Sequence, residues 1–158
     1  MARSAGASVS LQPLSLVYTA QAVSEGRWGL SLGLHTNMAS GGSHGTQADF
    51  DAVRSGAQRR YVLLRGSGQL SLPMGETMAF TSRINFQAAG KPLVPGEMFG
   101  AGGAQSVRGY EEREISGDSG AALTLEVQGG NLAENWVFAK GGSLHLIGFV
   151  DAGAVANQ

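Results

Sequence analysis

The chain contains no cysteine, which excludes disulfide bonds, thiolate metal sites and a cysteine nucleophile. Only 15% of its 158 residues are charged, against roughly 25% in typical soluble chains, so something other than charge must solvate much of the surface. The formal net charge of -1 gives no long-range field that would recruit nucleic acid. The composition therefore argues against a nucleic-acid partner and leaves the compartment open.

Long apolar runs are also absent. No stretch approaches the run of about 18 apolar residues that a transmembrane helix needs. The first ten residues carry one positive charge but no continuous apolar segment, so we do not expect a secretory signal there. If this chain lies in a membrane, it must cross it as β-strands.

Glycine is abundant, with 25 residues against 4 prolines, which favours strands and loops over helices. Apolar residues alternate with small or polar residues in six segments. Most of these segments have about 10 to 14 residues, which exceeds the usual soluble strand and suits a tilted membrane strand. The six segments are 8–21, 27–38, 61–73, 76–89, 121–128 and 143–153.

The connections alternate in length, as in barrels with short periplasmic turns and long outside loops. Residues 23–26 and 73–76 form short turns, whereas 39–59 and 90–120 form long loops. The linker 129–142 fits this scheme least well, because it is long for a turn.

Six strands cannot close a barrel of useful width, and a sheet with two bare edges would be prone to aggregation. The predicted fold is therefore all-β: residues 1–158 form about six strands of a larger transmembrane antiparallel β-barrel, and 90–120 is its long loop.

The long loop carries the most informative motif. A glycine-rich run delivers Val107-Arg108-Gly109-Tyr110 to its tip. In the last strand, Phe149-Val150-Asp151-Ala152-Gly153 places a lone carboxylate among apolar residues, which is costly unless a cation meets it. Alternation puts Phe149, Asp151 and Gly153 on one face. Arg108 is the candidate partner of Asp151, and Gly153 leaves room for a loop to approach.

With these two motifs and Gly117-Asp118-Ser119-Gly120 at the loop exit, the chain resembles the outer-membrane transporters of two-partner secretion, the haemolysin secretion/activation proteins. The resemblance implies a monomeric barrel of roughly sixteen strands in the lipid of the Gram-negative outer membrane. Such a barrel secretes a large exoprotein of haemolysin or adhesin type. The resemblance also implies that the loop folds into the lumen, where Arg108 pairs with Asp151.

The sequence departs from this family pattern at both ends. The periplasmic domains that precede the barrel and the strands that should follow Gln158 are absent, so we expect a C-terminal barrel fragment. Two alternatives remain open. The barrel-assembly insertases share the arginine loop, and a soluble β-sandwich could use similar strands as a binding module.

Further residues have a structural and a functional interpretation. We interpret Glu126 as a solvated pore charge, with a second partner for the loop as the alternative. Gly109 is expected to adopt a backbone conformation that other residues avoid. Tyr110 and Phe149 are expected to pack between loop and wall.

The remaining prominent side chains are interpreted in the same way. Arg65 and Arg83 are expected to be pore charges. Trp28, Tyr61 and Trp136 are expected either in interfacial aromatic girdles or in packed cores.

A serine protease is the enzymatic alternative, because Gly117-Asp118-Ser119-Gly120 is similar to a nucleophile loop, and His44 and Asp49 precede it in the right order. Ala121 stands where that family has a further glycine, and 158 residues are too few for two closed barrels. We therefore predict no enzyme, and no cofactor or metal, since the histidines lack ligand spacing. The three histidines are His35, His44 and His145.

Overall fold

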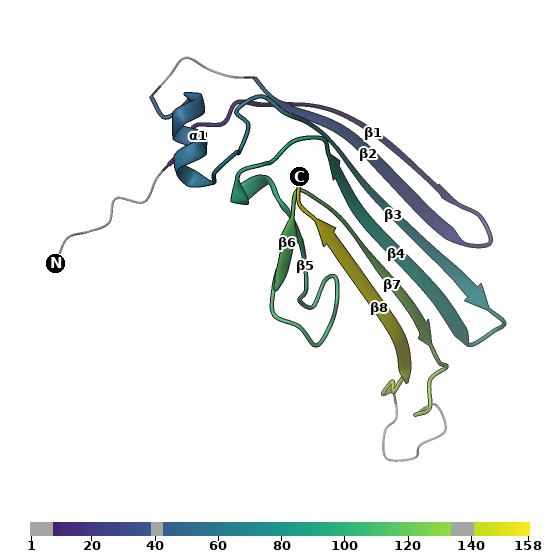
Figure 1. Cartoon of the computed structure of the whole chain (residues 1–158). Coiled ribbons are helices and arrows are strands. Elements are labelled where there is room, and N and C mark those ends of the chain that lie inside the picture. Colours follow the sequence, from purple (N-terminus) through teal and green to yellow (C-terminus); the bar gives the residue numbers. More distant parts are fainter. Residues whose placement is uncertain (1–7, 39–42, 134–140) are drawn as a thin grey trace.

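The computed structural model describes residues 8–38, 43–133 and 141–158. Six antiparallel strands form one open, curved sheet in the order β1-β2-β3-β4-β7-β8, with β1 and β8 at its edges (Figure 1). The predicted all-β antiparallel sheet is confirmed. The strands are β1 (Pro13–Val23), β2 (Arg27–Asn37), β3 (Val62–Met74), β4 (Met78–Ala89), β7 (Ser119–Gln128) and β8 (Ile147–Ala156).

The boundaries of the first and last strands differ from the predicted ones. The Leu144 amide donates to Asn131 Oδ1 at 2.9 Å, and Gly129 N donates to Leu146 O at 2.8 Å. Residues 143–146 therefore bond to the connection after β7, and β8 begins at Ile147. At the other end, Ser10 N donates to His44 O at 2.8 Å, so Ser10 bonds to the segment before α1, and β1 begins only at Pro13.

The strand register separates the sheet into two chemically different faces. Tyr18 pairs with Leu32 across β1 and β2, and Val150 pairs with Leu125 across β7 and β8. These side chains lie on the outer face, where many large apolar groups are exposed: Leu16 is 77% exposed and Val150 is 66% exposed.

The inner face is defined here as the opposite face, and it is mostly polar. One cross-strand row on this face comprises Gln21, Gly29, Gln69, Arg83, Thr124 and Asp151. In a β-sandwich the apolar face would be covered by a second sheet, but in the described part of this chain it is exposed. The β-sandwich alternative is therefore wrong.

The short helix α1 (Gln47–Val53) lies within the predicted loop 39–59 and was not predicted. It begins with a capping box, in which the Thr46 and Asp49 side chains bond to each other's backbone amides. Neither α1 nor the 3-10 turn η1 (Pro95–Glu97), the helical elements of the described residues, is long enough to cross a membrane.

One cluster of buried residues lies where β3 begins and β4 ends. Tyr61 is 4% exposed and belongs to a buried cluster with Leu63, Ala89 and Leu93. Tyr61 is therefore a core residue and not part of an aromatic girdle, and burial raises its pKa to about 12. Trp28 is 42% exposed on the outer face, and Trp136 lies outside the described residues.

The long connection between β4 and β7 folds back onto the sheet. It contains η1 followed by the hairpin strands β5 (Phe99–Ala101) and β6 (Ile115–Gly117), which were not predicted. β5 lies against β7 and β8, and β6 lies against β8 (Figure 1). The hairpin and its tip, residues 99–117, are called the inner loop below.

Candidate functional site

The tip of the inner loop is shaped by glycine and by one serine. Gly109 has a φ of 92° and Gly102 has a φ of 118°, a region that residues with a side chain rarely adopt. Ser106 Oγ accepts from Gly102 N at 2.9 Å and donates to Gly102 O at 2.8 Å. These bonds close a compact turn that presents Val107 and Arg108 to β7 and β8, the two strands called the wall below.

Two glycines on the inner face let the inner loop approach β7 and β8 closely. A Cβ added to Gly153 would lie 2.9 Å from Val107 Cγ2 and 3.0 Å from Ala101 Cβ. A Cβ on Gly120 would collide with the ring of Phe99. The wall therefore fits the inner loop because these two positions carry no side chain.

Arg108 contacts Asp151 with both its side chain and its backbone. Its Nε donates to Asp151 Oδ2 at 2.7 Å, its Nη2 donates to Oδ1 at 2.9 Å, and its amide donates to Oδ2 at 3.1 Å. The Asp151 side chain is only 3% exposed, and that of Arg108 is 28% exposed. The two-pronged contact fixes the orientation of the guanidinium as well as its distance.

Two further wall residues complete the arginine site. Glu126 Oε2 accepts from Arg108 Nη1 at 3.0 Å, so Glu126 contacts the inner loop and is not a free pore charge. The Phe149 ring centroid lies 3.5 Å from Arg108 Cζ, a cation–π contact. One guanidinium thus faces two carboxylates and an aromatic face. The bonds to Asp151, and after them those to Glu126, raise the pKa of Arg108 and keep it charged.

The other predicted site residues lie around this centre. Tyr110 follows Gly109 and is 60% exposed, so it is not packed between loop and wall as expected. Arg65 is not a free charge either, because its Nη2 donates to Glu97 Oε2 at 2.9 Å. Arg83 is exposed on the inner face.

The residues of the protease-like pattern have structural roles. Asp49 caps α1, and hydrogen bonds from the Thr46 side chain and backbone lower its pKa. Ser119 Oγ accepts from Ala89 N at 2.9 Å and donates to Ala89 O at 3.2 Å. Its hydroxyl is therefore engaged in joining β4 to β7.

One ion pair near the inner loop was not predicted. Arg54, at the C-terminal cap of α1, bonds to both carboxylate oxygens of Asp118, which is 0% exposed. Asp118 was identified as part of a motif, but the two residues are 64 positions apart and nothing in the sequence links them. The Thr46–Asp49 capping pattern is the signal that could have revealed the helix that carries Arg54.

Comparisons with known proteins agree with this architecture. CdiB from Escherichia coli has a similar structure, with a TM-score of 0.72 at 20% sequence identity, and the match covers 94% of this chain and 27% of CdiB. This likeness supports the predicted fold, an open section of an antiparallel β-barrel. No curated protein matches the sequence. The model of the family described as haemolysin secretion/activation protein ShlB/FhaC/HecB matches residues 3–158. Because this match spans nearly the whole sequence, the chain belongs to the haemolysin secretion/activation protein family.

Proposed function

We propose that this chain forms part of the wall of an outer-membrane pore that secretes a large exoprotein by two-partner secretion in a Gram-negative bacterium. The observation that carries the proposal is the inner loop, held against the polar face of a membrane-type sheet by Arg108, Asp151 and Glu126. The description of the matching family by secretion and activation favours this function over an insertase.

The outer face supports contact with lipid. Exposed apolar side chains extend from one edge of the sheet to the other, for example Tyr18 at 64%, Leu34 at 51% and Ile84 at 43%. A monomeric soluble protein rarely exposes so continuous an apolar surface. Burial of this face in hydrocarbon explains how a chain with few charges is solvated.

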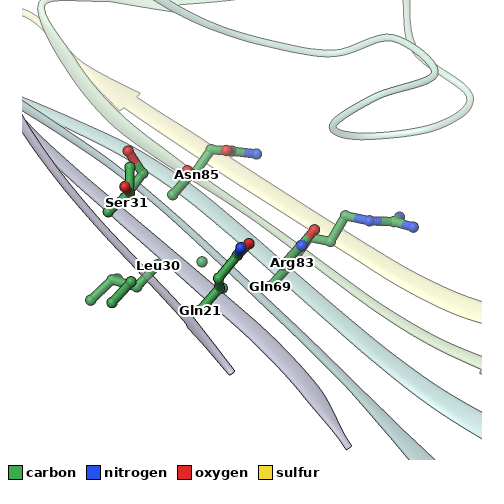
Figure 2. Close-up of a pocket in the computed structure, with 11 residues that line it drawn as sticks. Gln21, Leu30, Ser31, Gln69, Arg83 and Asn85 are labelled. Atoms are coloured by element: carbon green, nitrogen blue, oxygen red, sulfur yellow. The ribbon is translucent and has the colours of Figure 1, made fainter. Parts of the chain in front are cut away.

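The inner face supports passage of a polypeptide. A groove of about 690 Å³ runs over β1 to β4 and is lined mainly by hydroxyl, amide and glycine residues. Arg83 and Asn85 project to the side of the sheet on which the inner loop lies, whereas Leu30 extends to the other side (Figure 2). Uncharged polar groups can exchange hydrogen bonds with an extended chain without holding one sequence tightly.

In this proposal Arg108 fixes the inner loop and performs no chemistry. A bidentate contact with Asp151, a bond to Glu126 and the Phe149 ring define one position of the tip. The exoprotein must pass the same space, so the docked tip sets how wide the path is. Cargo folding outside would supply the driving force.

The test is Arg108→Ala in the full-length protein, co-expressed with the haemolysin-type exoprotein encoded in the same genome. We expect insertion into the outer membrane to persist while exoprotein in the medium falls strongly. Arg113→Ala is the matched control, because Arg113 lies in the same loop but its side chain donates to Met98 O, just before the loop, and among the described residues forms no ion pair with the wall. Normal secretion by the Arg108 variant would refute the assigned role.

A further inference from the structure

A second charged contact lies at the base of the inner loop, away from the Arg108 site. Asp118 accepts four hydrogen bonds: from Arg54 Nη1 and Nη2, from Leu93 N at 2.7 Å and from Gln158 N at 2.8 Å. Its side chain is completely buried. Loss of any of these donors would destabilise the fold, because it would leave a buried carboxylate with an unpaired oxygen.

This carboxylate joins the two ends of the long connection. Leu93 lies where the chain leaves β4, and Asp118 lies where it returns to β7. Gln87 strengthens the junction, since its Nε2 donates to Asp118 O at 2.9 Å and to Glu97 O at 2.9 Å. One side chain of β4 thus bonds to both the entry and the exit of the connection.

The junction is also attached to α1. Arg54 Nη1 donates to Leu93 O at 2.7 Å in addition to its contact with Asp118. Phe50 of α1 is 0% exposed and packs in a cluster with Ala57 and Val94. The connection between β2 and β3 therefore contacts the start of the connection between β4 and β7 through the Arg54 guanidinium and the buried Phe50 ring.

The charges at this junction depend on each other. Burial raises the pKa of Asp118, but the bonds from Arg54, from the Gln158 amide and from the Leu93 amide outweigh this effect, and the net pKa lies below its ordinary value. Asp118 is therefore ionised at neutral pH. Without Arg54 the same carboxylate would remain buried without its cation.

We infer that Arg54 and Asp118 are a positioning pair, which holds the base of the inner loop and couples its docking on the wall to the position of α1. The inference rests on the proposed function, since docking matters only if the inner loop sets the path. It adds a second point of control, because a displacement of α1 would loosen the inner loop without any change at Arg108.

Because these 158 residues contain no cysteine, one introduced here can be followed by thiol labelling once any thiol elsewhere in the full-length protein has been replaced. Ala122 lies on the inner face beside Gly153, where the inner loop approaches, and is 4% exposed. Ala122→Cys should react with a maleimide only when the inner loop leaves the wall. Ser67→Cys is the control, because Ser67 occupies the same cross-strand row but is already exposed.

We expect Arg54→Ala in the full-length protein to accelerate labelling of Ala122→Cys about tenfold or more, because it leaves Asp118 buried without a cation. Arg54→Lys should give a smaller rise, since it keeps the charge but cannot bond to both oxygens. Labelling of Ser67→Cys should not change. Heat-dependent gel mobility verifies that each barrel is folded, and the Lys variant remains informative if the Ala variant does not fold.

Two results would overturn the inference. One is unchanged labelling at position 122 in folded Arg54 variants, and the other is an equal rise at positions 67 and 122, which would mean general loosening. Labelling does not depend on secretion. Failure of the Arg108 secretion test would therefore refute the proposed function and leave this result interpretable.

Discussion

Gly153→Ala is a small change that should displace the inner loop from the wall. The new Cβ would lie 2.9 Å from Val107 Cγ2 and 3.0 Å from Ala101 Cβ, closer than ordinary van der Waals contact. Relief requires the tip to move away from β8, which carries Asp151 two positions earlier. Overpacking of this kind costs roughly 1–2 kcal/mol. The ratio of undocked to docked loop should then rise about 5- to 30-fold.

The assay is the labelling rate of Thr124→Cys. Thr124 is 8% exposed, and its Oγ1 donates to Ser106 O of the inner loop at 3.2 Å. When opening is rare and reclosing is fast, the labelling rate follows the open population. Gly148→Ala is the matched control on the same strand, because a Cβ there has no neighbour within 4 Å. Val107→Ala should partly restore protection in the Gly153 variant by removing the atom that clashes.

The steric argument fails if Gly153→Ala labels at the unsubstituted rate, or if Gly148→Ala accelerates labelling equally. Absence of coupling between the substitutions at 153 and 107 would contradict it as well.

The remaining predictions concern the two charged sites. The double variant Arg108→Asp with Asp151→Arg should recover part of the secretion that either single change abolishes. Recovery should stay partial because Glu126 would repel the new aspartate. A double variant that secretes no better than the single ones would argue against direct pairing. Acid should release the base of the inner loop: Asp118 has a lowered pKa, so its stabilising effect is present above 3.8 and is lost as the pH falls below that value. The labelling rate of Ala122→Cys with a dithiodipyridine, divided by that of Ser67→Cys at the same pH, should stay flat from about pH 8 to about pH 5 and rise in stronger acid. A rise of this ratio near neutral pH would contradict the prediction.

The strands could be predicted because each one has an apolar and a polar side, so a period of two is visible in the sequence alone. Ile84 and Phe86 alternate with Arg83, Asn85 and Gln87, and β4 occupies almost the predicted range. The same rule missed β5 and β6, which have three residues each and contain glycine. Their pairing depends on the wall beneath them and not on their own pattern.

Contacts between side chains far apart in the chain were harder to predict from the sequence. Arg108 and Asp151 could be brought together because a lone acid in an apolar strand indicates a missing cation. Glu126 was expected to be solvated, since nothing in a strand sequence reveals how far an arginine reaches across it. Arg54 belongs to a helix that was expected to be a loop, so its contact with Asp118 depends on an element that the pattern did not predict.

The shared carboxylate at the junction also affects how quickly the inner loop can return. Leu93 N and Asp118, 25 positions apart, meet in one hydrogen bond, so the segment between them is a closed ring even when its tip is free. The entropy of bringing its ends together does not have to be paid again at each release. A freed Arg108 stays tethered near its acceptor, as in an intramolecular binding step with a millimolar effective concentration. We therefore expect a released inner loop to return to the wall spontaneously, without closing this ring anew.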